Sequence, residues 1–423
     1  MRTAVEPPFS SDETTMRLIL LLALSLGTLI PQQQARFDDT VRNLRNPDPN
    51  ARLQALKLLR ESQYLEAVEP IAPLVNDPLD AVQLEAIATE LSFYSVGKVE
   101  AGKRMVFIVE TRSSGRAQTA FASGPLAAWP RAVPEVLSTN LLKAVNDENA
   151  KVRIEAIYTF GVIARPPLAA DAEAELIKAL DHYDPAIRAA AARVAGRLQA
   201  KGTGKALINA VNDSQAVVRF AAMRALGDIR EEHAIQALMQ QLEYYKKDEG
   251  AWSALDGLAK IGHASSVGLF TTYLSDKDPY LRRAAAEGLG RAGASSAISA
   301  LETGVGTDPS DSVRAAMAFA LQNLGKPYVS RLAESLKSDK LARQVSDYLM
   351  ELGPAIAPDL LPHLKDPDEA IRGNVALVLG AIGSDSEALA LEPLTKDRDR
   401  EVALAATRGI ERIKIRKSGS AGS

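Results

Sequence analysis

The chain has 423 residues, a formal net charge of -3 and no cysteine. Without cysteine there can be no disulfides, thiolate zinc sites, iron–sulfur clusters or cysteine nucleophiles, and the near balance of 50 basic and 53 acidic residues argues against binding nucleic acid by bulk charge. The residues are 46% hydrophobic but only 5% aromatic, which favours closely packed helices over a β-sandwich. We therefore expect an all-α protein.

The first 35 residues are expected to be a leader that is separate from the folded chain. Residues 18–30 form an uncharged apolar run that is shorter than a bilayer span of about 20 residues and typical of the apolar core of a signal peptide. A start at Met16 removes the acidic residues that precede this run. We predict cleavage near Ala35 and an exported protein, periplasmic or secreted; an uncleaved leader would instead anchor the chain to a membrane.

Residues 36–94 contain the first, looser copies of a helical repeat that is clearer further along the chain. These copies start near Leu44 and Leu74, and the same slot holds Arg52 in one and Gln83 in the other. We expect this region to form helix pairs of the same kind as those of residues 135–413.

Residues 95–134 interrupt the repeat. A β-branched and aromatic run, Met105–Thr111, is followed by a Ser-Ser-Gly turn and then by residues 116–122, which predicts a β-hairpin. Residues 124–134 contain three prolines and a glycine, so this stretch is expected to be non-helical and to lie extended along a surface.

Aromatic and basic residues are concentrated in this insertion and in one long turn near residue 245. Trp, Tyr and Arg are the residue types most often found at the centre of protein interfaces, although the same side chains could simply pack the insertion onto its own helices. The candidate partner-binding residues are Phe107, Arg112, Arg116, Phe121, Trp129, Arg131, Tyr244, Tyr245 and Trp252.

Residues 135–413 repeat one unit with a period of about 31 residues. An Asp/Asn-rich turn, which caps the following helix, precedes an arginine in most copies. Trp252 stands where one arginine is missing, and a last copy near Leu394 also lacks it. Apolar residues after Val218 form a stripe with the 3.6-residue period of a helix. The recurrent arginines are Arg153, Arg188, Arg219, Arg282, Arg314, Arg343 and Arg372, and a glycine follows eight residues later at Gly161, Gly196, Gly227, Gly290 and Gly380.

The pattern Asp-x-x-x-x-Val-Arg-x-x-Ala-Ala-x-x-Leu-Gly-x-Ile resembles the HEAT repeat, and in particular the short, Ala-rich class of phycobilisome lyases. The resemblance covers about residues 38–413. It implies a right-handed α-solenoid of about eleven antiparallel helix pairs. It also implies that the recurrent Asp and Arg residues link adjacent turns as a structural ladder. Residues 414–423 are expected to form a basic, Ser/Gly-rich flexible tail.

The sequence contains no catalytic motif in the structural context that its chemistry requires. Gly288-Leu-Gly-Arg-Ala-Gly293 matches a dinucleotide-binding fingerprint but lies at the end of a predicted helix rather than after a strand. The four histidines lie far apart, and the Asp-x-Asp pairs lie in capping turns. We therefore predict no catalytic residue, no cofactor and no metal, and hence a protein that is not an enzyme.

The slot five residues after the repeat arginine predicts the character of the inner face. It holds polar, charged, aromatic and aliphatic residues, and such a mixed surface favours a protein partner over nucleic acid. We predict a non-enzymatic scaffold that binds another protein through its groove or through residues 95–134. The alternatives are an accessory subunit of a bilin lyase-type enzyme, which the resemblance implies, and a membrane-anchored envelope assembly factor. The slot residues are Tyr158, Arg193, Arg224, Glu287, Phe319, Tyr348 and Leu377.

Overall fold

The computed structural model describes residues 36–96 and 115–420, which fall into two compact units, residues 1–93 and 94–423. The leader with its predicted cleavage site lies outside the described residues, as do the run Met105–Thr111 and the candidate Arg112. Within the described ranges the regular structure is helical, and no helix there has both the length and the apolar character needed to cross a bilayer.

Unit 1 consists of helix pairs joined by short turns. Asp48 caps α2 by accepting a hydrogen bond from the backbone N–H of Asn50 at 2.9 Å, and Pro49 is the first helical residue, an arrangement typical of a helix start. Its helices are residues 36–43, α2 (Pro49–Ser62), α3 (Val68–Ile71) between the 3-10 turns η1 (Leu65–Ala67) and η2 (Ala72–Asn76), and α4 (Asp80–Tyr94).

Glu90 is a buried carboxyl group of α4. Its side chain is fully buried, and neither carboxyl oxygen has a hydrogen-bond partner among the described residues. Burial raises the pKa of Glu90 well above its ordinary value, because a low-dielectric surrounding disfavours the charged form. The folded state therefore retains a proton that the unfolded chain releases above its own, lower pKa, so stability falls as pH rises through the range between the two pKa values.

We expect Glu90→Gln to remove this loss and to raise the free energy of unfolding by about 1 kcal/mol at the alkaline end of the range. Urea unfolding between about pH 5 and 8 would measure the change. Glu61→Gln, at an exposed position of α2, is the matched control and should leave the pH dependence intact. The same pH dependence in Glu90→Gln as in the parent chain would contradict the assignment.

Unit 2 begins with α5 (Arg116–Ala122) and the 3-10 turn η3 (Pro125–Ala127), and continues as a regular series of helix pairs. The pairs are α6 (Glu135–Ala144) with α7 (Ala150–Ile163), α8 (Ala170–Leu180) with α9 (Pro185–Arg197), α10 (Gly204–Ala210) with α11 (Ala216–Asp228), α12 (Ile235–Tyr245) with α13 (Asp248–Ile261), α14 (Val267–Tyr273) with α15 (Pro279–Arg291), α16 (Ile298–Thr307) with α17 (Asp311–Asn323), α18 (Val329–Ser335) with α19 (Asp339–Leu352), α20 (Ala357–Leu360) with α21 (Glu369–Ile382), and α22 (Asp385–Leu391) with α23 (Arg400–Ser420).

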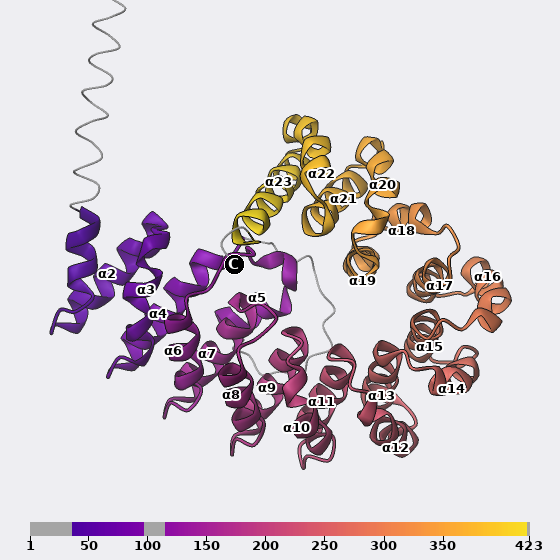
Figure 1. Cartoon of the computed structure of the whole chain (residues 1–423), viewed down its shortest axis with the longest axis horizontal. Helices are drawn as coiled ribbons and strands as arrows, with labels where there is room; N and C mark the ends of the chain where they lie inside the picture. The colour runs from indigo at the N-terminus through magenta and orange to yellow at the C-terminus, as the bar shows by residue number, and fades with distance from the viewer. Residues whose placement is uncertain (1–35, 97–114, 421–423) are drawn as a thin grey trace, which may run out of the picture. The chain divides into compact units, whose positions relative to one another are not determined.

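The second helices of these pairs pack against one another in sequence, α7 on α9, α9 on α11 and so on to α21 on α23. In Figure 1 they line the inner side of the arc that unit 2 describes, and the first helices of the pairs lie on its outer side. The core lies between them and consists of small and aliphatic side chains such as Ala190, Leu226 and Leu289. A helix pair of this kind buries its apolar face only by stacking on its neighbours.

The prediction that residues 116–122 form the second strand of a β-hairpin is wrong. These residues form the helix α5, which packs on α7. Their sequence, Arg-Ala-Gln-Thr-Ala-Phe-Ala, is rich in good helix formers. The described residues contain only an isolated antiparallel bridge, between Ser95 and Ala128, and no strand. Residues 124–134 contain one short 3-10 turn and are otherwise irregular.

An arginine ladder runs along the turns that join the two helices of each pair. Each arginine lies near the start of a second helix and reaches an aspartate in the corresponding turn of the next pair. The bidentate bonds from Arg188 hold the pKa of Asp213 below its usual range. The pairs, with N–O distances between 2.7 and 2.9 Å, are Arg52–Asp77 in unit 1, and Arg153–Asp184, Arg188–Asp213, Arg282–Asp308 and Arg372–Asp397 in unit 2.

Other occupants of the arginine slot bond differently. The indole N–H of Trp252 donates to Asp278 at 2.6 Å, so the tryptophan takes the place of the missing arginine. Arg219 donates to the hydroxyl of Tyr245 instead of to a carboxylate. Arg314 pairs with Asp311 of its own helix. Arg343 donates to a backbone carbonyl of residues 115–134.

Candidate functional site

Residues 115–134, here called the inner segment, pack against the inner helices of unit 2. The backbone N–H of Ala117 donates to Glu155 of α7 at 3.0 Å, and the ring of Phe121 lies 5.2 Å from that of Tyr158. Beyond η3 the N–H of Trp129 donates to the carbonyl of Tyr94 at 2.7 Å. The inner segment is therefore fixed to the first helices of unit 2.

Four arginines from well-separated parts of unit 2 donate to backbone carbonyls of the inner segment. Arg165 directly follows α7, and the others lie on α9, α19 and α23. The inner segment therefore connects helices near the start of unit 2 with helices near its end. The bonds are Arg197 to Phe121 at 2.8 Å, Arg343 to Ala122 at 2.7 Å, Arg412 to Leu126 at 2.9 Å and to Ala128 at 2.8 Å, and Arg165 to Trp129 at 2.7 Å.

Two of these arginines also lie over aromatic rings. The guanidinium of Arg197 is 3.8 Å from the ring centre of Phe121, and that of Arg412 is 5.9 Å from Trp129. Burial and the repulsion of nearby arginines lower the pKa of Arg197 and of Arg412 to about 10. Within the part of the chain that the structure describes, neither group forms an ion pair with a carboxylate. Their partners are carbonyl dipoles and π faces.

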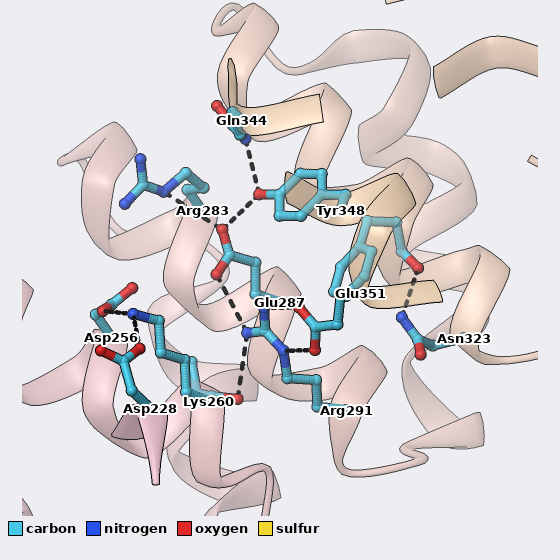
Figure 2. A network of polar contacts seen from close by, with 12 residues as sticks. Asp228, Asp256, Lys260, Arg283, Glu287, Arg291, Asn323, Gln344, Tyr348 and Glu351 are labelled. Atoms are coloured by element: carbon cyan, nitrogen blue, oxygen red, sulfur yellow. Dashed lines mark hydrogen bonds and ion pairs between the residues drawn. The ribbon is translucent and has the colours of Figure 1, made fainter. Parts of the chain in front are cut away.

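A buried polar network occupies the inner helices α15 and α19, as Figure 2 shows. Its centre is Glu287, which pairs with Arg283 at 3.5 Å and with Arg291 at 3.2 Å and accepts a hydrogen bond from the hydroxyl of Tyr348. Arg291 also forms a bidentate pair with Glu351, with both N–O distances at 2.8 Å. Burial opposes ionisation of Glu351, but the bonds from Arg291 outweigh it and hold the pKa of Glu351 below its usual range.

A second cluster adjoins this network. The ammonium of Lys260 lies 2.8 Å from Asp228 and 3.1 Å from Asp256. Burial disfavours the charged lysine, yet the two carboxylates more than compensate and raise the pKa of Lys260. Lys260 of α13 is thus paired with Asp228 of α11, and Arg291 of α15 donates to the carbonyl of Ala259 of α13 at 3.4 Å, so these contacts join three consecutive helix pairs (Figure 2).

The slot predicted to form a mixed inner surface is largely buried. Tyr158, Glu287, Phe319 and Tyr348 are each at most 5% exposed. The rings of Phe319 and Tyr348 stack at 4.4 Å, and Arg193 donates to the hydroxyl of Tyr158 at 2.8 Å. These four buried residues present little surface to a partner, because the inner helices approach closely. The side chain of Arg224, in the same slot, is 43% exposed.

One hollow of about 230 Å³ lies between α11, α13 and α15. The rings of Trp252 and Tyr280 stack in it at 4.4 Å between their centres. Arg224 and Glu249 form a pair at 3.0 Å in which both side chains are more than 40% exposed. This hollow, here called the Trp252 hollow, therefore combines accessible aromatic and charged groups. Its lining residues are Arg224, Glu249, Trp252, Asp256, Tyr280 and Arg283.

The residues predicted from the sequence to bind a partner do not lie together in the structure. Phe107 and Arg112 lie outside the described residues. Arg116, Phe121, Trp129 and Arg131 belong to the inner segment, where Arg116 is exposed, Phe121 is buried and the other two are half-buried. Tyr244 is 76% exposed and contacts the ring of Tyr245 at 5.0 Å, whereas Trp252 lines the hollow.

Sequence reasoning missed Arg165, Arg197 and Arg412. One available signal was the slot directly after the repeat glycine, which holds Arg197, Asp228 and Arg291 in three of the copies. Charged residues at a position next to a close-packing glycine indicate partners inside the molecule, since unpaired charges are costly to bury. Within the described ranges no three His, Cys, Asp or Glu residues are placed to hold a metal ion.

The paired helices, their repeat arginines and the inner-side contacts define unit 2 as an α-solenoid built from one repeated unit. The chain belongs to the HEAT-repeat family: the family's sequence model matches residues 138–203, 173–251, 246–322 and 329–411, which together make up more than half of the chain. A comparison with curated protein sequences finds no match.

Solved structures with a similar arrangement share little sequence with this chain. An engineered protein is 19% identical, with 89% of this chain and 98% of that chain covered and a TM-score of 0.40. The complex of CpcE and CpcF of phycocyanin lyase from Nostoc sp. is 20% identical, with 59% and 96% covered and a TM-score of 0.40. Human deoxyhypusine hydroxylase is 19% identical, with 66% and 96% covered and a TM-score of 0.29.

Proposed function

We propose that this protein is a non-enzymatic scaffold that binds another protein through the inner side of unit 2. The observation that carries the proposal is the Trp252 hollow, where the stacked rings of Trp252 and Tyr280 lie beside the exposed pair of Arg224 and Glu249. Tyrosine, tryptophan and arginine supply most of the binding energy in many protein interfaces. HEAT repeats generally mediate protein–protein binding, which agrees with this use of the surface.

The arrangement of the hollow suits a protein side chain better than a chemical reaction. Asp256, the carboxylate of its floor, already pairs with Lys260 at 3.1 Å. Arg283 pairs with Glu287 at 3.5 Å. Both groups are thus held in place by the inner network, and the stacked rings and the Arg224–Glu249 pair remain to contact a partner. Such an aromatic platform with one charge of each sign at its rim favours a polar segment of a partner protein.

The double variant Arg224→Ala/Tyr280→Ala is expected to weaken partner binding about tenfold or more, because it removes two contact groups while leaving Trp252 bonded to Asp278. Crosslinking in the native cell followed by mass spectrometry would identify the partner, and titration calorimetry with the purified partner would measure the affinity. Circular dichroism should show unchanged helical content.

Tyr244→Ala is the matched control, since Tyr244 is an exposed tyrosine that does not line the hollow. It should leave the affinity unchanged. Equal affinity of the double variant and the parent chain would refute binding at the hollow. A loss of partner affinity in Tyr244→Ala alone would place the interface on α12.

A further inference from the structure

The arginines on the inner side hold the inner segment by its backbone. Arg165, Arg197, Arg343 and Arg412 make five hydrogen bonds to main-chain carbonyl oxygens between residues 121 and 129, at 2.7 to 2.9 Å. Arg165 also donates to the carbonyls of Val162 and Ala164. Two of the carbonyls of the inner segment belong to the last residues of α5 and one to the turn η3, and every peptide carries such carbonyl acceptors. The four guanidinium groups therefore form a site that fits a polypeptide backbone, and in this structure the occupant is the chain itself.

The charge of this site is not balanced by its occupant. The inner segment between residues 121 and 131 contains no Asp or Glu and adds a further cation, Arg131. The carboxylate of Asp347 lies 3.9 Å from Arg343 and that of Glu411 lies 4.0 Å from Arg131. Asp228 and Asp347 also favour the charged form of Arg197 through space, without contacting it as an ion pair. Arg165, Arg197 and Arg412 form no ion pair with any residue of the described ranges. Buried charges of one sign whose hydrogen bonds all go to neutral groups are costly.

An anionic ligand would satisfy these groups better than the inner segment does. A carboxylate can bind a guanidinium through two parallel hydrogen bonds and adds the attraction of an opposite charge, which a backbone carbonyl does not carry. The burial that lowers the pKa of Arg197 and of Arg412 also strengthens an ion pair formed there, since the local dielectric is low.

We propose that the inner segment is an internal occupant of a peptide-binding site, and that the external ligand is an acidic segment of a partner protein. The carboxylates of that segment pair with Arg165, Arg197 and Arg412 after residues 121–129 have left. The inference rests on the proposed role in protein binding but uses residues other than those of the Trp252 hollow. A peptide is favoured over a nucleic acid because a polypeptide backbone already lies within hydrogen-bond distance of all four arginines.

Trp129 provides a direct probe of the occupant. The chain has two tryptophans, Trp129 and Trp252, so Trp252→Phe leaves Trp129 as the single tryptophan of the full chain. The centre of its ring lies 6.0 Å from the guanidinium group of Arg131 and 5.9 Å from that of Arg412. The backbone N–H and carbonyl of Trp129 are both hydrogen-bonded. Departure of the inner segment exposes this ring to water, which shifts its fluorescence to longer wavelength.

Titration of Trp252→Phe with an oligoglutamate peptide of about 12 residues, a length that spans the nine residues from 121 to 129, is expected to give a saturable red shift. A glutamine peptide of equal length should give none. Arg197→Gln/Arg412→Gln should weaken oligoglutamate binding about tenfold or more. If that variant fails to fold, as judged by circular dichroism, Arg412→Lys alone replaces it and should weaken binding several-fold, because lysine keeps the charge but loses the bidentate geometry.

Gly124→Ala is expected to strengthen oligoglutamate binding, whereas the arginine variants weaken it. Gly124 has a φ of +91°, where any side chain is strained, and an added Cβ would lie 3.6 Å from the guanidinium of Arg343, an ordinary van der Waals contact. The substitution should loosen the inner segment and tighten oligoglutamate binding several-fold, because apparent affinity follows the fraction of molecules with a free site.

Several results would overturn the proposal: no binding of oligoglutamate, binding without a shift of Trp129, or unaltered affinity in Gly124→Ala. A tighter response to an oligothymidylate than to oligoglutamate would overturn the class of ligand. Failure of the proposed scaffold function at the Trp252 hollow can be told apart from failure of this inference. If Arg224→Ala/Tyr280→Ala left native partner binding intact while oligoglutamate still moved Trp129, the hollow would be excluded and the arginine site retained.

Discussion

Gly227→Val is expected to lower the free energy of unfolding by about 3 kcal/mol. Gly227 of α11 faces Gly257 of α13, and a Cβ atom on Gly227 would lie 2.7 Å from the Cα and 2.9 Å from the carbonyl oxygen of Gly257. Both are backbone atoms, so no side-chain rotation can relieve the contact. The two inner helices would have to move apart, and the flanking apolar contacts of Leu226 and Leu258, both fully buried, would loosen with them.

Urea unfolding followed by circular dichroism would measure this change. Gly306→Ala is the matched control, because Gly306 is an exposed glycine of helix α16 with no atom within 4 Å of an added Cβ. It should raise the free energy of unfolding by about 0.5–1 kcal/mol through helix propensity. A Gly227→Val chain as stable as the parent would show that the helices can separate at little cost.

The repeat itself was predictable because each of its features is set by the neighbouring copy. The glycine eight residues after the arginine stands where two inner helices meet most closely, as Gly227 and Gly290 do. The arginine slot reaches the next turn, and Trp252 serves the same purpose with its indole N–H, as its position in the period suggests. Contacts between adjacent copies recur with the period, so one sequence is enough to indicate them.

Contacts between distant copies have no such period. Arg343 occupies the ladder slot, yet its carbonyl partner, Ala122, lies 221 residues earlier in the chain. Arg412 and its partner Leu126 are 286 residues apart. The helix α5 was mistaken for a strand because the seven residues Arg116–Ala122 are short enough for either structure, and packing on α7 decides between them.

Curvature explains why Glu287 and Tyr348 of the inner slot are buried. Glu287 of α15 and Tyr348 of α19 are 61 residues apart and contact one another although α17 lies between them in sequence. Helices two copies apart can meet only where the inner side of unit 2 is tightly curved, and the degree of curvature depends on small rotations between pairs. The slot residues were identified, but their burial could not be read from their spacing.

Glu287→Ala is expected to lower the free energy of unfolding by about 3–5 kcal/mol, the usual cost of removing one partner of a buried ion pair. Its side chain is 6% exposed and neutralises two arginines. Arg291 retains its bidentate pair with Glu351, but Arg283 has no other ion pair within the described ranges. The hydroxyl of Tyr348 also loses the carboxylate to which it donates.

The Arg291–Glu351 pair that remains in Glu287→Ala makes the stability of this variant depend on pH. Because Arg291 holds the pKa of Glu351 low, that carboxylate stabilises the fold above its ordinary pKa and loses its contribution as pH falls through the lowered value. In Glu287→Ala, where the centre of the network is missing, acid unfolding should therefore begin at higher pH than in the parent chain. Glu302→Ala, which removes an exposed pair with Lys326 at 3.5 Å, should change stability by no more than about 0.5 kcal/mol.

A double-mutant cycle separates the cost of a stranded charge from the loss of contacts. If Arg283 is destabilised by the absence of Glu287, then adding Arg283→Met to Glu287→Ala should restore about 1–3 kcal/mol, since the methionine fills the space without a charge. Strictly additive losses in the double variant would mean that Arg283 reaches water when Glu287 is removed. The inner side of unit 2 would then be open enough at α15 for solvent to replace a carboxylate, and the network would be a solvated surface feature rather than a buried support for the Trp252 hollow.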